Sequence, residues 1–243
     1  MKTIAIITAR GGSKRIPRKN IREFCGKPIL AYSVEAAVAS GVFDHVMVST
    51  DDGEIAEIAK QYGAEVPFYR SEKTANDYAT TSDVLLEVLE EYEKWGEQFE
   101  IGCCIYPTAP FVTGEKLKNA VEKLEDSDAD SLIPVVPFSY PPQRALVMEG
   151  ERLVFRYPEY LNSRSQDLQP HYHDAGQFYV FRTAAFQRTK NIMTGNILPL
   201  VVSELEVQDI DNLTDWQIAE MKYMLRRNWD GERYVSDSGR RQC

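Results

Sequence analysis

Cysteines are few in this sequence and long apolar runs are missing, and both shortages narrow the kinds of protein that it can encode. Only four of the 243 residues are cysteine and none forms a Cys-x-x-Cys pair, which disfavours a disulfide framework or a zinc site. No window approaches the roughly 18 apolar residues of a membrane span, and the chain opens on a strand-like segment instead of a signal peptide. We therefore expect a globular cytoplasmic protein that spans no membrane.

Basic residues are also fewer than acidic residues in the sequence as a whole. Lysine and arginine number 28 against 37 aspartate and glutamate residues, giving a net charge of −9. Such a charge repels polyanions, which argues against binding to nucleic acids or to an anionic membrane surface. An anionic ligand would therefore need cations concentrated at one place.

Such a concentration occurs in the segment 9–20, directly after the first strand-like run. It contains two glycines, a serine and five cationic side chains, and no acidic residue. Glycine lets a backbone approach a ligand closely, and free N–H groups in such a loop bind phosphate oxygens. The loop lacks the residue order of a Walker A motif, which disfavours an ATPase of that class. We predict that Arg10, Lys14 and Lys19 neutralise a triphosphate, and a solvated basic loop is the alternative.

Strand-like and helix-like segments alternate along the N-terminal half, which predicts an α/β fold with a mostly parallel sheet and covering helices. The expected strands are 3–8, 45–50, 66–68, 101–106, 131–136 and 176–181. The expected helices begin after Pro28, at the Asp51–Glu54 pair, near 85 and 115, and at the Thr214–Gln217 pair. Ligands of such sheets bind beyond the carboxyl ends of the strands, which is where the basic loop falls.

The alternation fails from 138 to 173, where proline, arginine, tyrosine and glutamine are abundant. We interpret this stretch as an inserted arm rather than another strand–helix unit. The main domain is expected to span 1–227, with the arm included. Residues 228–243 are polar, and we predict that they form an irregular tail.

Two carboxylates, Asp209 and Asp211, precede the last expected helix. Residues i and i+2 of an extended chain project to the same side, and a pair of carboxylates suits a hard cation such as Mg²⁺. An exposed acidic pair near a helix start is the alternative interpretation. The basic loop favours the metal site, because a metal ion is the usual partner of a transferring phosphoryl group.

Polar side chains also gather in 162–167 and 171–177. Arginine, asparagine, serine, glutamine and aspartate are the residue types that pair with hydroxyl, acetamido and carboxylate groups, although a plain polar loop is the alternative. The His171-x-His173 pair lacks a third ligand at suitable spacing, so we discount a transition metal. The loop before the long helix contains Arg70, Asp77, Thr80 and Thr81. This loop is typical of a helix start and alone indicates no chemistry.

Together these motifs resemble the acylneuraminate cytidylyltransferases, also called the CMP-sialic acid synthetase family. The similarity runs over roughly 3–227 and rests on Ala9–Asn20, Val48–Asp51, Pro107–Pro110 and Asp209–Asp211. It implies a three-layer, Rossmann-like fold of the nucleotide-diphospho-sugar-transferase kind, with CTP and an acidic nine-carbon keto sugar as substrates. It also implies Mg²⁺ or Mn²⁺ as cofactor, a homodimer formed through the 138–173 arm, and a product used in bacterial flagellin or surface-glycan modification.

The resemblance assigns roles to individual residues as well. Catalysis would involve Lys14, Lys19, Asp209 and Asp211, and the two aspartates would hold the metal ion. The CTP site would contain Arg10, Gly11, Gly12, Ser13, Lys14, Lys19, Asn20, Arg70, Ala79 and Thr81. The sugar site would contain Tyr106, Arg164, Gln166, His173, Asp174 and Gln177.

Two departures from the sialic acid members indicate a different sugar. Tyr106 stands where those members have glutamine, and His173–Gly176 replaces their Arg-Pro-Asn-Gly run. The segments Tyr106–Pro110, Asn162–Asp167 and Tyr172–Tyr179 instead resemble the pseudaminic acid branch of the family. Pseudaminic acid is less hydroxylated, and a buried amide without a partner is costly, so tyrosine suits that sugar. Sialic or legionaminic acid is the alternative substrate, and a CTP-binding regulatory protein without turnover is the alternative of another class.

Overall fold

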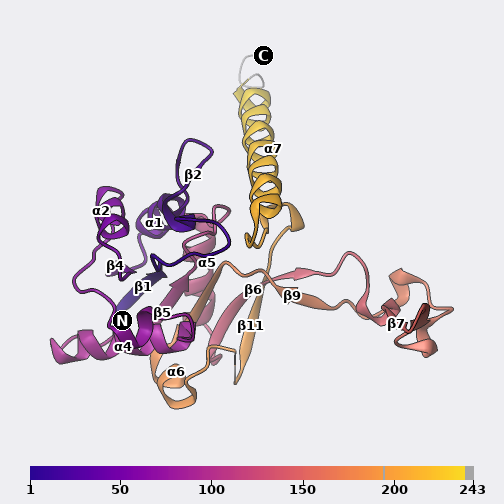
Figure 1. Ribbon diagram of the computed structural model, residues 1–243, viewed down its shortest axis with the longest axis horizontal. Helices are drawn as coiled ribbons and strands as arrows, with labels where there is room; N and C mark the ends of the chain where they lie inside the picture. The colour runs from indigo at the N-terminus through magenta and orange to yellow at the C-terminus, as the bar shows by residue number, and fades with distance from the viewer. Residues whose placement is uncertain (194, 239–243) are drawn as a thin grey trace.

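The computed structural model describes residues 1–193 and 195–238, which form a central seven-stranded sheet with helices around it (Figure 1). The strand order is β11 (Ile197–Val201), β6 (Ser131–Pro137), β10 (Phe178–Arg182), β5 (Ile101–Ile105), β1 (Thr3–Thr8) and β4 (His45–Ser49), and β9 (Tyr172–Asp174) pairs with β6. Strands β9 and β10 run antiparallel to their neighbours, and the other pairs are parallel. The predicted α/β fold with a mostly parallel sheet is confirmed.

Helices cover both faces of the sheet, because its central strands are apolar on both sides. One face is covered by α1 (Ile29–Ser40), α2 (Gly53–Gln61) and α5 (Gly114–Glu125). The other face is covered by α4 (Thr81–Lys94) and α6 (Thr183–Thr189). The adjacent cysteines of β5 show this two-sided burial, since Cys103 belongs to the first core and Cys104 to the second.

A further buried cluster joins the last helix to the N-terminal loop. Helix α7 (Leu213–Ser238) begins beside the hairpin of β2 (Glu23–Phe24) and β3 (Lys27–Pro28). Trp216 of α7 packs edge-on against Phe24, with ring centroids 5.5 Å apart, and Ile16 and Ile210 are buried in the same cluster. This packing places the segment before α7 next to the basic loop. The main domain also contains three short helical segments, namely η1 (Lys19–Ile21), α3 (Glu72–Ala75) and η5 (Glu204–Glu206).

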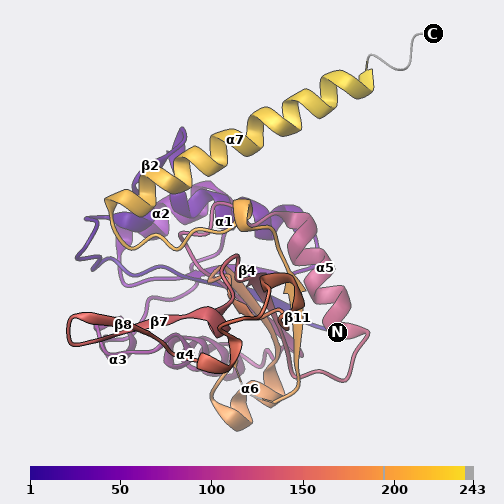
Figure 2. The same cartoon turned by 90° about the vertical axis from the view of Figure 1, so that its right-hand side faces the viewer.

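The segment 138–173 leaves the sheet after β6, projects away from the main domain and returns as β9 (Figure 1), so that its strands β7 and β8 lie in front of the main domain in Figure 2. It contains a hairpin of β7 (Leu146–Glu149) and β8 (Arg152–Phe155), and the turns η2 (Pro142–Arg144), η3 (Pro158–Tyr160) and η4 (Ser165–Asp167). The hairpin exposes large apolar side chains, among them Leu146, Met148 and Leu153. An isolated two-stranded hairpin is marginally stable in water, so contact with a partner surface would stabilise this hairpin.

The structure corrects several local predictions. No strand forms at 66–68, where Pro67 lacks the N–H group that a strand ladder requires; an isolated bridge joins Glu65 to Met47 instead. Asp52 rather than Asp51 caps α2, because its carboxylate accepts hydrogen bonds from the N–H groups of the first helical turn.

Helix α7 also differs from expectation at both ends. Its cap is formed by Asn212 and Asp215, which exchange side-chain and backbone hydrogen bonds, and not by Thr214 and Gln217. The helix continues to Ser238, so the irregular chain expected over 228–238 is wrong, and 239–243 lie outside the described residues. In the part of the chain that the structure describes, no helix is both long and apolar enough to cross a membrane.

Candidate active site

The basic loop follows β1 at the carboxyl edge of the sheet and lies against the start of α2. The N–H group of Gly11 donates a hydrogen bond to Asp51 Oδ1 at 2.9 Å. A Cβ atom on Gly11 would lie 2.7 Å from Asp52 Oδ2, so the close approach of the two segments requires glycine here. The Arg18 guanidinium, which pairs with Asp52, holds the pKa of that carboxyl below its usual value. An anionic oxygen thus already engages the loop backbone, as a phosphate oxygen would.

Two predicted phosphate-binding cations of the loop share one partner. Arg10 Nη1 lies 2.6 Å and Lys14 Nζ 2.5 Å from the carboxylate of Asp77, which sequence analysis did not assign to the site. The hydrogen bonds from Lys14 and Arg10 hold the pKa of Asp77 below its usual value. Asn20 is buried and donates from Nδ2 to the carbonyl oxygen of Arg10 at 2.9 Å, which fixes the loop from within.

The basic loop also contacts the carboxylate segment that precedes α7. Lys19 Nζ donates to the carbonyl oxygen of Ile210 at 2.7 Å, and Arg15 pairs with Asp211 at 2.7 Å. Burial lowers the pKa of Lys19, while the charges of Asp211 and Asp209 act in the opposite direction. The loop predicted to bind phosphates and the segment predicted to bind metal therefore meet at one place.

Asp209 and Asp211 are the carboxylates available there to a divalent metal ion. Asp209 lines a cavity and is exposed, whereas Asp211 is engaged by Arg15. The described residues contain no group of three or more His, Cys, Asp or Glu side chains that could enclose a metal ion. This pair still fits Mg²⁺, which keeps several waters and is usually bound through one or two protein carboxylates together with substrate phosphates.

Side chains that sequence analysis missed hold the carboxylate segment in place. Lys222 of α7 donates to the carbonyl oxygen of Val207 at 2.7 Å. The Glu206 carboxylate pairs with Lys116 of α5 at 3.0 Å and with Arg226 of α7 at 3.2 Å. Burial lowers the pKa of Lys116, and its hydrogen bond and ion pair with Glu206 oppose this effect. No local pattern reveals these residues, because the partners come from distant parts of the chain.

The residues expected to surround the nucleotide base lie where α4 begins. Thr80 and Asp83 form a capping box, and an N-cap of this kind contributes about 1 kcal/mol to helix stability, so the turn Ala79–Thr81 is well fixed. Arg70 Nε donates to Ser49 Oγ at 2.8 Å. Burial lowers the pKa of Arg70 to about 10, and its Nη2 atom is buried without a hydrogen-bond partner among the described residues. Such a donor indicates a place where a ligand acceptor binds, because leaving it unpaired is costly.

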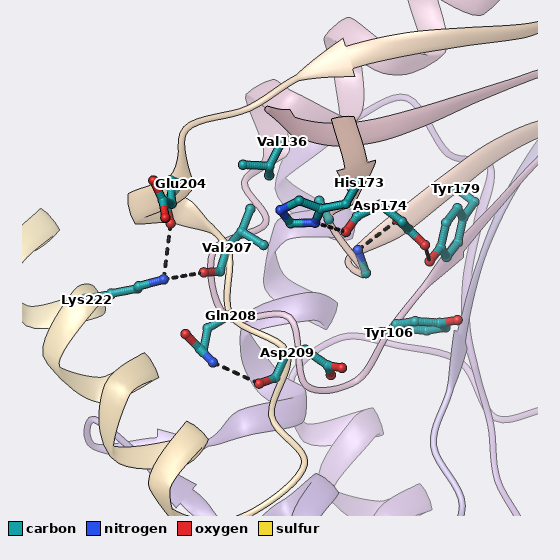
Figure 3. A pocket seen from close by; sticks show the side chains of 12 residues that line it. Tyr106, Val136, His173, Asp174, Tyr179, Glu204, Val207, Gln208, Asp209 and Lys222 are labelled. Atoms are coloured by element: carbon teal, nitrogen blue, oxygen red, sulfur yellow. Dashed lines mark hydrogen bonds between the residues drawn. The ribbon is translucent and has the colours of Figure 1, made fainter. Parts of the chain in front are cut away.

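A cavity of about 590 Å³ opens beside the carboxylate segment (Figure 3). This volume lies within the roughly 300–1,000 Å³ typical of small-molecule sites. The cavity lining includes four residues that the sequence predicted for the site, namely Tyr106, His173, Asp174 and Asp209. It also includes residues that were not predicted, among them Tyr179, Glu204, Gln208 and Lys222.

Hydrogen bonds connect the side chains in one wall of this cavity (Figure 3). Tyr179 donates to Asp174 Oδ2 at 2.6 Å, and the N–H group of Gly176 donates to Asp174 Oδ1 at 2.9 Å. The rings of Tyr106 and Tyr179 pack edge-on with centroids 5.5 Å apart. Burial raises the pKa of Tyr106.

Three residues predicted for the sugar site lie outside this cavity. Gln177 is buried behind the wall, where its Nε2 donates to a backbone carbonyl of η5. Arg164 and Gln166 lie on the projecting arm, and Arg164 pairs with its neighbour Asp167 at 2.7 Å. The structure therefore separates the arm residues from the cavity of the same chain.

Comparison with known proteins defines the family of the chain. The sequence model of the family described as Cytidylyltransferase matches residues 4–198. A pseudaminic acid cytidylyltransferase from Campylobacter jejuni is 41% identical over 226 residues, which are 93% of this chain and 97% of that protein. A CMP-N,N'-diacetyllegionaminic acid synthase from Legionella pneumophila is 32% identical over 227 residues, covering 90% of this chain and 95% of that protein. The chain belongs to the cytidylyltransferase family.

A solved structure shares the fold. CMP:2-keto-3-deoxy-manno-octonic acid synthetase complexed with CTP matches with a TM-score of 0.68, over 94% of this chain and 100% of that one, at 17% identity. At this identity the likeness concerns the fold alone. The family and the fold that the sequence motifs indicated are both confirmed, and with them the enzyme class of nucleotidyltransferases.

Proposed function

We propose that the chain joins CMP to pseudaminic acid, using CTP and releasing pyrophosphate. One observation carries the proposal: the basic loop and the Asp209–Asp211 segment meet beside a sugar-sized cavity, where Lys19 reaches Ile210. The 41% identity to a pseudaminic acid cytidylyltransferase over 93% of the chain supports the choice of sugar.

The reaction exchanges one bond for another at the α-phosphorus of CTP. The anomeric hydroxyl oxygen attacks this phosphorus in line, its proton leaves to a base, and the bond to the pyrophosphate oxygen breaks. Arg10, Lys14 and Lys19 stabilise the negative charge of the departing pyrophosphate. Loss of one such contact typically costs about 2–4 kcal/mol of transition-state stabilisation. The backbone of Gly11–Ser13 would bind phosphate oxygens, with Asn20 supporting the loop.

Asp209 and Asp211 would hold the divalent cofactor, Mg²⁺ or Mn²⁺, which neutralises phosphate charge when it is bound. Arg15 must then release Asp211, so its guanidinium becomes available to the phosphates. On the opposite side, Arg70, Ala79 and Thr81 would surround the cytosine. The unpaired Nη2 of Arg70 supports this assignment, since a carbonyl of the base would satisfy it.

The charge of the cavity supports a role for the arm of a second chain. Asp174, Glu204 and Asp209 line the cavity against a single ammonium group from Lys222, so within the described lining acidic groups outnumber basic ones. An acidic sugar requires additional positive charge there. We propose a homodimer in which the arm of one chain supplies it, with Arg164 as the contributing residue. The exposed apolar side chains of the hairpin support such an interface.

Tyr106 favours pseudaminic acid over a more hydroxylated sugar. Its ring and that of Tyr179 form an aromatic part of the cavity wall, which suits the 9-deoxy end and the acetamido methyl groups. The 32% identity to a CMP-N,N'-diacetyllegionaminic acid synthase makes legionaminic acid the second candidate, with the same chemistry on a stereoisomer.

Pyrophosphate release tests the proposal directly. The purified chain is assayed with CTP and Mg²⁺ in the presence of pseudaminic, legionaminic or N-acetylneuraminic acid, and with ATP and GTP as nucleotide controls. We expect release with CTP and pseudaminic acid. Preference for another of these acids would overturn the interpretation of Tyr106 and retain the mechanism. CTP binding without release for any acid would favour a non-catalytic CTP-binding protein.

A further inference from the structure

Two tyrosines and an aspartate lie together in one wall of the cavity. Tyr106 follows β5, Tyr179 lies in β10, and Asp174 is the last residue of β9. The hydroxyl of Tyr179 donates a hydrogen bond to the carboxylate of Asp174, and its ring packs edge-on against that of Tyr106. Tyr179 is only 5% exposed and was not among the residues predicted for the site.

The direction of the hydrogen bond between Tyr179 and Asp174 follows from the chemistry of the carboxylate. An ionised carboxylate can only accept, so Tyr179 must donate its single proton to Asp174.

Asp174 is held at both carboxylate oxygens. Tyr179 binds Oδ2 at 2.6 Å, and Gly176 N–H binds Oδ1 at 2.9 Å from a left-handed conformation, with φ of 62°, that favours glycine. The backbone of Asp174 is fixed as well, because it pairs with Val135 in the sheet. The carboxylate lines the cavity and retains free acceptor positions, so it presents a fixed acceptor to a ligand there.

We propose that Tyr179 is a positioning residue for sugar specificity: its hydroxyl fixes the Asp174 carboxylate as the acceptor for an N–H or O–H donor of the bound sugar. This inference rests on the proposed function and assigns to Asp174 a class of ligand group, the acetamido N–H or a ring hydroxyl.

Steady-state kinetics of Tyr179→Phe, Asp174→Asn and the double variant test the assignment. We expect Tyr179→Phe to raise the KM for the sugar about tenfold and to leave the KM for CTP within about twofold, because a site built around a hydrogen bond discriminates strongly when it is disturbed. Asp174→Asn should raise the sugar KM further. The double variant should be no worse than Asp174→Asn alone, because Tyr179 acts through Asp174.

Tyr32→Phe is the matched control, since it removes a tyrosine hydroxyl that donates to the carbonyl oxygen of Phe24 at 2.7 Å, away from this cavity. It should leave both KM values unchanged. An unchanged sugar KM in Tyr179→Phe, or effects that multiply in the double variant, would overturn the proposal. The assay of the wild-type chain tests the proposed function separately, and the variants are then compared with whichever nonulosonic acid the wild-type chain converts. Absence of conversion with every acid would refute both the proposed function and the role of Tyr179.

Discussion

Asp77 Oδ1 lies 2.6 Å from Arg10 Nη1, although the two residues are 67 positions apart in the chain. The other carboxylate oxygen of Asp77 lies 2.5 Å from Lys14 Nζ. These two cations are the ones assigned to the phosphates of CTP. On this assignment the Asp77 carboxylate occupies donors that the nucleotide would need, so CTP binding would replace one anion by another.

Asp77→Asn should tighten the binding of CTP. Removal of the competing charge frees Arg10 and Lys14, and we expect the Kd to fall about three- to tenfold, a modest change because exposed ion pairs are weak. Titration calorimetry with CTP and no sugar measures the effect. Glu57→Gln, which breaks an exposed pair with Lys60 on α2, is the control. A weaker affinity in Asp77→Asn would show that this carboxylate orients the two cations instead of competing for them.

Lys14→Ala should reduce kcat/KM for pyrophosphate release by about 10²- to 10³-fold, as expected for removal of a charged group that stabilises the leaving group. Arg18→Ala provides a control in the same loop, because Arg18 is engaged by Asp52 and Glu54 at the start of α2. It should change kcat/KM by less than about threefold, since its surface ion pairs contribute little. Equal losses in both variants would indicate that the loop as a whole, and not Lys14, supports the reaction.

Asp211→Ala should make the reaction depend on much higher metal concentrations. We expect the Mg²⁺ concentration for half-maximal rate to rise at least about tenfold, because one of two carboxylate ligands is lost. A Mg²⁺ titration at saturating CTP and sugar measures this shift, and Mn²⁺ binding monitored by electron paramagnetic resonance gives a readout independent of turnover. Asp126→Asn, at the exposed end of α5, is the control. Normal Mg²⁺ dependence in Asp211→Ala would refute the metal assignment.

The sequence was sufficient to predict where the basic loop lies, for a physical reason. Segment 9–20 contrasts in charge with an acidic chain, and it follows a strand whose buried, apolar character is unambiguous. A loop after such a strand falls at the carboxyl edge of the sheet, where ligands bind. Neither inference depends on a tertiary contact, and the structure places the loop at this edge.

Other parts of the site could not be predicted, because they depend on which distant groups meet. Asp77 belongs to a helix-start loop without a chemical signature, yet it pairs with Arg10 and Lys14. Asp52 caps α2, whereas Asp51 accepts a hydrogen bond from the N–H group of Gly11, which is far away in the sequence. Such outcomes follow from packing between segments, whereas local patterns describe each segment alone.

Mixing two inactive chains should restore activity if the arm acts on the partner. Arg164→Ala removes the proposed arm contribution, and Lys14→Ala removes the loop contribution. In a heterodimer of the two variants, one site combines an intact loop with an intact arm from the other chain. Random reassociation makes half of the dimers mixed, each with one intact site of two, so we expect about a quarter of the wild-type rate.

The mixture is prepared by coexpression of the two variants, and pyrophosphate release is compared with the sum of the separate variants. Lys14→Ala mixed with Asp211→Ala is the control, because both residues belong to the main-domain part of the site in one chain. Every site of this mixed dimer carries one of the two defects, so no recovery is expected. Recovery in the first mixture and not in the control shows that the arm of one chain serves the site of its partner, whereas no recovery in the first mixture would refute this. A tandem fusion carrying both Arg164→Ala and Lys14→Ala in one copy, beside a wild-type copy, tests the same assignment independently: an arm that serves its own site leaves the wild-type copy fully active, at about half the wild-type rate, whereas an arm that serves the partner disables both sites.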